Sequence, residues 1–265
     1  MAAATRQAGT GHYRFRHVAR MEWIKLRTLR STWWTLAITV AGATAMAILI
    51  GTNTRNGAGD LTNNALAGVV PGLLLTGVLG VLMMTSEYTS GMIRATLAAV
   101  PGRPLVLAAK AAVFGVVALG AGEAASFISF AAGGAALRHG IAAPSLSQPG
   151  VLRAVVLAGA SFSLIGLLGV GLGAIVRHTA AAIAILVGGV YLAAQLVGAV
   201  AQGAAAYMPV LIIGNSLTAT KPENCPPHAA LCPHFLSVWA GLGVLCLYAA
   251  VALGAGAWLL ARRDA

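Results

Sequence analysis

Long apolar runs alternate with short polar segments along the chain. Each run holds about 20 residues, the length that an α-helix needs to cross a bilayer. The pattern predicts an all-α membrane protein with a transmembrane domain over residues 33–260. The six predicted transmembrane helices cover residues 33–51, 66–86, 105–131, 151–176, 180–201 and 237–260. Only three residues, Arg177, His178 and Thr179, separate the fourth run from the fifth.

The composition indicates that lipid surrounds much of the chain. Apolar residues make up 58% of the 265 residues and charged residues only 9%. Mean hydropathy is +0.84. A soluble domain carries about a quarter of charged residues, because water has to solvate its surface. A chain with so few charges cannot cover its own surface in water.

The positive charges are placed as in a membrane protein rather than as in a nucleic-acid-binding protein. The net charge is +11, but seven of the seventeen Lys and Arg residues precede residue 31. Most of the others lie in short gaps between apolar runs. We therefore expect membrane lipid as a partner and no nucleic acid.

The same residues predict the orientation in the plasma membrane, because cytoplasmic segments carry an excess of Lys and Arg. With a cytoplasmic N-terminus, segments 1–32, 87–104 and 261–265 lie inside, and 202–236 is an external loop. The inside segments then hold thirteen positive residues: Arg6, Arg14, Arg16, Arg20, Lys25, Arg27, Arg30, Arg94, Arg103, Lys110, Arg177, Arg262 and Arg263. The outside segments hold four: Arg55, Arg138, Arg153 and Lys221. Six crossings return the C-terminus to the cytoplasm.

Residues 15–30 have the pattern of an amphipathic helix that lies on the inner leaflet. At helical spacing one face carries Phe15, Val18, Ala19, Leu26 and Leu29, with Trp23 at its edge. Arg16, Arg20 and Arg27 gather on the other side, where anionic headgroups and water can solvate them.

Glu22 interrupts the apolar face of this helix, where a carboxylate would be poorly solvated. Lys25 follows three residues later and can pair with it across the helix surface. The position of Glu22 predicts a contact with another part of the protein or with a partner.

The cytoplasmic segment 87–104 contains a second amphipathic pattern. Thr89 or Ser90 can cap a short helix, and Pro101 ends it. Between them, residues recur at helical spacing: Met92, Ile93, Thr96, Leu97 and Val100. Two interpretations remain open from spacing alone: a helix that docks in a groove of a soluble partner, or a connecting loop that rests on the membrane.

Two segments of the chain resemble the permease subunits of type-2 ABC exporters. The first runs from Glu22 to Trp34 and is similar to the N-terminal interfacial helix of the family as it enters the first span. The second is similar to the loop between the second and third spans of the family. The residues that carry this second resemblance are Glu87, Tyr88, Gly91, Ile93, Arg94, Thr96, Leu97, Pro101, Arg103 and Lys110.

The resemblance implies a permease that pairs with a second copy of itself or with a similar subunit. It also implies two copies of an ABC ATPase on a separate chain. The first cytoplasmic loop would be the coupling helix, with Glu87, Gly91, Arg94, Thr96 and Arg103 as its site residues. The interfacial helix would contribute Glu22, Lys25, Arg27 and Arg30.

The sequence contains no G-x-x-x-x-G-K-[ST] motif with which to hold nucleotide phosphates. We therefore expect no enzyme activity and no cofactor on this chain, with ATP and Mg²⁺ bound by the partner. A secondary, ion-gradient-driven transporter is the alternative, and a membrane-embedded enzyme is a third. The sequence does not specify the transported substrate.

Glu123 is an ionisable residue inside a predicted span. It follows Lys110 by thirteen residues, which is roughly 20 Å along a helix. A charge at the membrane centre costs on the order of 3 kcal/mol on insertion scales, so Glu123 should face the bundle or a cavity. Two hypotheses remain: a role in the transport pathway or its gating, or a protonated carboxyl bonded to a nearby serine.

In the fourth span, Gly169 and Gly173 favour close helix packing within the subunit.

The external loop contains Cys225 and Cys232 with two histidines nearby. A disulfide is expected outside the cell, and the spacing matches no common zinc pattern, although a metal site is the alternative. Cys246, in the last span, is expected to be a buried thiol. The apolar stretch 207–217 is too short to cross the membrane and predicts a re-entrant or interfacial helix.

Overall fold

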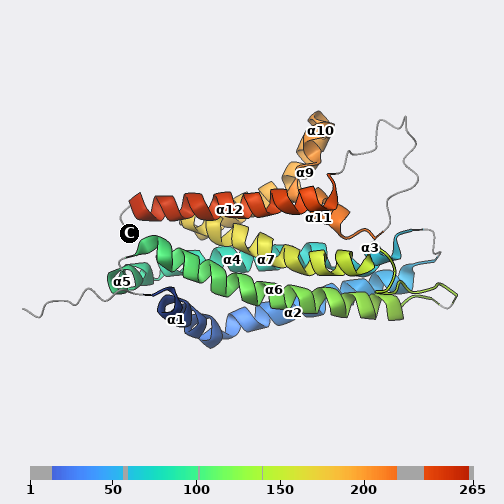
Figure 1. Cartoon of the computed structure of the whole chain (residues 1–265), viewed down its shortest axis with the longest axis horizontal. Helices are drawn as coiled ribbons and strands as arrows, with labels where there is room; N and C mark the ends of the chain where they lie inside the picture. The colour runs from blue at the N-terminus through green and yellow to red at the C-terminus, as the bar shows by residue number, and fades with distance from the viewer. Residues whose placement is uncertain (1–13, 56–58, 101, 139, 220–235, 263–265) are drawn as a thin grey trace, which may run out of the picture.

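The computed structural model describes residues 14–55, 59–100, 102–138, 140–219 and 236–262, and these are helical apart from short connections (Figure 1). No β-strand occurs among them. The helices are α1 (Phe15–Thr28), α2 (Arg30–Asn53), α3 (Leu61–Leu66), α4 (Val69–Thr89), α5 (Met92–Ala99), α6 (Arg103–Ala135), α7 (Val151–Val176), α8 (Thr179–Val187), the π-helix η1 (Gly188–Leu192), α9 (Ala193–Val200), α10 (Gln202–Ala205), α11 (Pro209–Ser216) and α12 (Val238–Arg262).

Five helical segments in the described part of the chain are long and apolar enough to cross a membrane. They are α2, the α3–α4 segment from Leu61 to Thr89, α6, α7 and α12. These segments cover five of the six predicted runs, and they lie side by side with their axes nearly parallel (Figure 1). The prediction of an all-α, multi-pass membrane protein is confirmed at this level.

The fifth predicted span, 180–201, is not confirmed as a single long helix. It is divided into α8, η1 and α9, and its continuous apolar helix covers only Thr179–Leu192. Two glycines, Gly188 and Gly189, open the π-helix, where the missing side chains weaken the helix. Beyond this point, α9 and α10 lean away from the bundle (Figure 1).

Between α7 and α12 the chain nevertheless runs from one end of the bundle to the other. Arg177, just after α7, donates a hydrogen bond to the Leu259 carbonyl oxygen near the end of α12. Thr218, just after α11, accepts a hydrogen bond from Arg153 at the start of α7. The segment between Arg177 and Thr218 therefore connects the two ends of α7. The predicted short helix over 207–217 is present as α11.

Helix α7 lies at the centre of the bundle and packs against α4, α6 and α12. Glycines make the closest approaches. A Cβ atom at Gly169 would overlap the carbonyl oxygen of Gly77 on α4, and one at Gly80 would overlap that of Gly166 on α7. Gly173 lies against Val81 on the same helix pair. The predicted role of Gly169 and Gly173 in packing within the subunit is confirmed.

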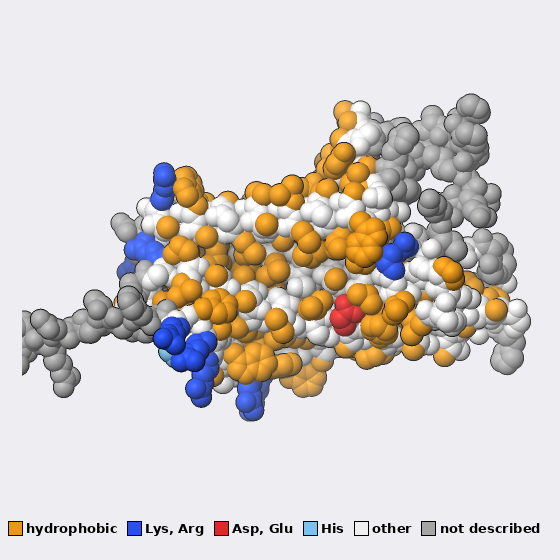
Figure 2. Space-filling model, in the orientation of Figure 1, with side chains coloured by type: hydrophobic (Ala, Val, Ile, Leu, Met, Phe, Trp, Pro, Cys, Tyr) orange, Lys and Arg blue, Asp and Glu red, His pale blue; other side chains and the backbone are white. Residues whose placement is uncertain are grey.

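The visible side of the bundle is largely apolar, and Lys and Arg side chains gather at the end that holds α1 (Figure 2). All five tryptophans are exposed by 41–69%, and Trp239 and Trp258 mark the two ends of α12. Their separation of nineteen residues corresponds to roughly 28 Å of helix, close to the thickness of a bilayer core. Tryptophans at these positions form the aromatic belts of a membrane protein.

Cys246 on α12 is exposed rather than buried, because only one side of this peripheral helix packs on the bundle.

Candidate functional site

Four charged side chains meet at the end of the bundle where α1 and the C-terminal end of α12 lie (Figure 1). The Lys110 ammonium of α6 lies 2.6 Å from Glu22 Oε2 of α1 and 2.7 Å from Glu87 Oε1 of α4. The Lys25 ammonium lies 3.1 Å from Glu22 Oε1 and 3.1 Å from Glu87 Oε1. We call Glu22, Lys25, Glu87 and Lys110 the charge cluster. It joins three helices that are far apart in the sequence.

The charge cluster is buried and electrically balanced. Glu22, Lys110 and Glu87 are exposed by only 0%, 2% and 6%, while the Lys25 side chain retains 24%. Two carboxylates face two ammonium groups, so each charge taken out of water has opposite charges beside it. Such compensation is required, because an isolated buried charge costs several kcal/mol.

The environment of the charge cluster changes the pKa of Lys25. Burial by itself lowers the pKa of Lys25, but the carboxylates of Glu22 and Glu87 raise it, and the net pKa lies above the ordinary lysine value. Lys25 therefore keeps its positive charge at neutral pH. The predicted Glu22–Lys25 pair is present, and Glu22 also has the predicted contact with another part of the protein.

One face of α1 was expected to contact the membrane leaflet. Part of this face packs instead on other helices of the same chain. Val18 and Leu26 are fully buried. Val18 packs with Val106 and Ala109 of α6, and Leu26 packs in a cluster that includes residues of α4, α5 and α6. The rest of the predicted apolar face is more open: Phe15, Trp23 and Leu29 are exposed by 41–46%. The predicted basic side is exposed, with Arg16, Arg20 and Arg27 on it, and Arg30 is exposed at the start of α2.

Segment 87–104 does contain a short helix, α5. Its start differs from the expectation that Thr89 or Ser90 caps it. Both hydroxyls donate back to the Ser86 carbonyl oxygen at the end of α4. Gly91 instead precedes the helix in a left-handed conformation with φ = 70°, which glycine adopts without the steric cost of a side chain.

Helix α5 has an inner face that packs on the subunit and an outer face that is open. Ile93, Thr96 and Val100 are buried. The Thr96 hydroxyl accepts a hydrogen bond of 3.3 Å from the Lys25 ammonium, so α5 is tied directly to the charge cluster. Met92 and Arg94 are exposed.

The predicted coupling residues therefore divide into three groups by exposure. Glu87 and Thr96 are buried and bonded within the subunit, so neither presents its side chain to a soluble partner. Arg103 is half-buried and donates to the Leu260 carbonyl oxygen at the end of α12. Gly91 and Arg94 are exposed. A direct contact with a partner is available to Arg94, whereas Glu87 and Thr96 can act only through the charge cluster.

Two contacts at this end were not predicted from the sequence. Lys110 was included among the family-like residues, but its place between two carboxylates was not foreseen. The Arg177 guanidinium lies 5.2 Å from the centre of the Tyr88 ring, which is a cation–π distance. The sequence did contain a signal for the contact of Lys110 with carboxylates. The chain has only six Asp and Glu residues, so each one beside an apolar run requires a partner.

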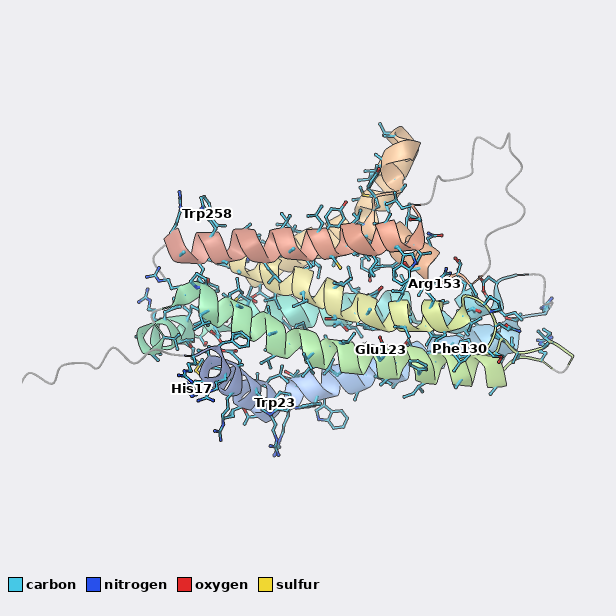
Figure 3. All side chains as sticks on the ribbon, in the orientation of Figure 1. His17, Trp23, Glu123, Phe130, Arg153 and Trp258 are labelled. Atoms are coloured by element: carbon cyan, nitrogen blue, oxygen red, sulfur yellow. The ribbon has the colours of Figure 1, made fainter. Side chains whose placement is uncertain are left out.

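Glu123 lies on α6 well away from the charge cluster (Figure 3). Its side chain is half-buried and lies against Gly159 of α7. The nearby Ser126 hydroxyl bonds to the backbone carbonyl of Glu123 at 3.0 Å and not to its carboxyl group. The predicted contact of the carboxyl with a serine is therefore absent from the hydrogen bonds of the described residues.

The predicted Cys225–Cys232 disulfide lies outside the described residues. Within the described ranges, no group of three or more His, Cys, Asp or Glu side chains is arranged to hold a metal ion.

Comparison with known proteins places the chain in no family. Its sequence matches no model of a known protein family. No curated protein matches it closely enough to count as a relative. A functional assignment has to rest on the residues themselves and on their geometry.

Proposed function

We propose that the chain is the membrane-spanning permease subunit of a type-2 ABC exporter, driven by a separate ATPase. The observation that carries this proposal is the connection between α5 and the charge cluster. A short helix with an open outer face is bonded through Thr96 to Lys25. Lys25 and Lys110 then bridge α1, α4 and α6 through Glu22 and Glu87.

This geometry suits the transfer of movement from a soluble motor to transmembrane helices. A partner that pushes on α5 also pushes on Lys25 and on the end of α4, which is two residues away from α5 in the chain. The buried ion pairs resist separation, because pulling one member away leaves a buried charge without compensation. Movement of α5 is therefore passed to α1 and α6 rather than absorbed by a loose loop.

The resemblance of residues 22–34 and 87–110 to the type-2 exporter family supplies the rest of the proposal. Two permease subunits, identical or similar, would form the translocation pathway, with two copies of the ATPase on the cytoplasmic side. ATP and Mg²⁺ would be bound by the ATPase. The permease itself would carry out no chemical step.

The proposal requires that α5 faces the cytoplasm. Most of the Lys and Arg side chains that are visible in Figure 2 lie at the end of the bundle that holds α1 and α5. By the positive-inside rule this end is cytoplasmic. The N-terminus and C-terminus then both lie in the cytoplasm of a plasma-membrane protein.

Reporter fusions test this orientation. Fusions after Asn63 and after Pro222 should report the outside, because both follow an outward crossing. Fusions after Pro101 and at Ala265 should report the cytoplasm. A C-terminal reporter on the outside would mean an odd number of crossings, and an external reporter after Pro101 would place α5 where no ATPase can reach it.

A secondary transporter is the second candidate, and Glu123 is the observation that favours it. Ion-coupled transporters use intramembrane carboxylates to bind protons or metal cations. Glu123 is the only acidic residue in the middle of a described spanning helix, whereas coupled transporters usually combine several ionisable groups with broken helices near the midplane. Uphill transport by the purified chain alone in liposomes, driven by a proton or sodium gradient, would favour this candidate over the ABC permease.

A further inference from the structure

Glu123 presents a carboxyl group on the side of the bundle that faces lipid. It lies in the middle of α6, about 20 Å along the helix from Lys110. In Figure 2 it is the acidic side chain surrounded by hydrophobic ones on the visible face, and Figure 3 labels it there. Its carboxyl has no hydrogen bond or ion pair with any described residue.

The helix packing leaves room for this carboxyl at the surface. A Cβ atom on Gly159 would lie 2.5 Å from Glu123 Cδ, so a side chain at position 159 would displace the carboxyl group from its present place. The neighbouring side chains on the same face are apolar: Val116 and Phe127 on α6 are exposed by 71% and 37%, and Val156 on α7 by 41%. The carboxyl is therefore lodged between two helices and open on its outer side.

No Lys or Arg among the described residues pairs with the Glu123 carboxyl group. Within the described spanning helices, Lys and Arg occur only in the first or last third of each helix. Lys110 is held between Glu22 and Glu87. Arg153, on the same face (Figure 3), donates to the Thr218 carbonyl oxygen at 3.0 Å. A second copy of the chain has the same distribution of Lys and Arg in its described spanning helices.

An apolar groove begins one turn from Glu123. It lies between α2 and α6, has a volume of about 390 Å³, and includes Gly120 of α6. Gly120 is three residues before Glu123, so the two share one side of the helix. The other lining residues are Trp33, Leu36, Ala37, Val40, Val117 and Ala121. The groove and the carboxyl together offer an apolar surface next to one negative charge.

We propose that Glu123 and this groove bind an amphiphilic cation that enters sideways from the membrane. The cationic group pairs with the Glu123 carboxylate, and the apolar body lies along the groove toward the cytoplasmic leaflet. Charge complementarity selects the occupant, because lipid tails fill the groove but leave the carboxylate without a counter-charge. That the bound molecule is the transported substrate rests on the proposed function, whereas the binding itself does not.

Binding of tetraphenylphosphonium to the purified chain in phosphatidylcholine nanodiscs tests the proposal. Tetraphenylborate is the matched probe, since it has nearly the same shape and the opposite charge. Wild-type protein should bind the cation saturably and the anion only by non-saturable partitioning. Glu123→Gln should weaken cation binding by about tenfold or more, because the ion pair forms away from bulk water. Glu123→Asp should keep part of the affinity.

Ile128→Gln is the control variant, because it adds the same amide to the lipid-facing side of α6 and keeps the carboxyl. It should bind tetraphenylphosphonium as the wild type does. Equal affinity of wild type and Glu123→Gln for the cation, or saturable binding of both ions alike, would overturn the proposal. No ATPase takes part in this assay, so its failure leaves the proposed permease function intact.

A second measurement uses only the wild-type chain. Dicyclohexylcarbodiimide is an apolar reagent that modifies carboxyl groups accessible from lipid. Mass spectrometry should locate the adduct on Glu123, and tetraphenylphosphonium should slow its formation, while tetraphenylborate should not. Modification at an unchanged rate in the presence of the cation would show that Glu123 is accessible but binds no cation, and would contradict the proposal.

Discussion

Replacing Lys110 with methionine is expected to lower the free energy of unfolding by about 3–5 kcal/mol, the usual cost of removing one partner from a buried ion pair. Lys110 is exposed by only 2%, and its ammonium group lies closer to the Glu22 and Glu87 carboxylates than that of Lys25 does. Without it, two buried carboxylates share Lys25 alone. The measurement is a denaturation titration in mixed micelles, followed by tryptophan fluorescence.

The double variant Glu22→Gln/Lys110→Met separates electrostatic loss from lost packing. It leaves Glu87 opposite Lys25 and so restores a balanced charge in the cluster. We expect it to be more stable than Lys110→Met alone by about 1 kcal/mol or more, since contacting residues couple by amounts of this order. If Lys110→Met is too unstable to purify, the double variant should restore the yield of monodisperse protein. If the losses of unfolding free energy caused by Glu22→Gln and Lys110→Met simply added in the double variant, the charge cluster would not be a coupled unit.

Arg94→Glu is expected to weaken binding of the ATPase without changing the stability of the permease. Arg94 is exposed on the outer side of α5, and it forms no hydrogen bond or ion pair with the described residues. Reversing a charge at an interface typically costs about 2 kcal/mol or more, which corresponds to roughly 30-fold in affinity. The measurement is the amount of ATP-hydrolysing activity that co-purifies with the tagged chain from its native membrane.

Arg20→Glu is the matched control, because Arg20 is also exposed at the same end but lies on α1. It should retain the co-purified activity. Loss of activity in both variants would indicate a general effect of negative charge at this end of the bundle. Unchanged activity in Arg94→Glu would remove the outer face of α5 from the interface.

The sequence predicted most of the helices because a spanning helix is a local feature. Apolar length alone placed α2, α4, α6, α7 and α12 within a few residues. The same measure placed a continuous span over 180–201, where the chain forms α8, η1 and α9 instead. Apolarity does not reveal where a helix bends, and Gly188 and Gly189 are common residues in membrane helices. The role of Gly91 at the start of α5 was also missed, because the sequence is equally consistent with a helix capped by Thr89 or Ser90.

The charge cluster was predicted only in part, for a physical reason. Glu22 and Lys25 lie on one helix, so their spacing alone allowed the pair to be expected. Glu87 and Lys110 are 65 and 88 positions beyond Glu22, and only the packing of α1 against α4 and α6 brings them to it. The buried state of Glu87 follows from that packing, and it changes the expected role of Glu87 from docking to internal linkage.

Photo-crosslinking from α5 tests the central claim most directly. A benzophenone amino acid in place of Arg94, irradiated in the native membrane, should form an adduct whose second chain contains a G-x-x-x-x-G-K-[ST] motif. The same amino acid at Arg138, at the opposite end of the bundle, should not form that adduct. An adduct at position 94 with a protein that lacks a nucleotide-binding motif, or none at all in protein that is correctly inserted, would contradict the account of α5 as the contact with an ATPase.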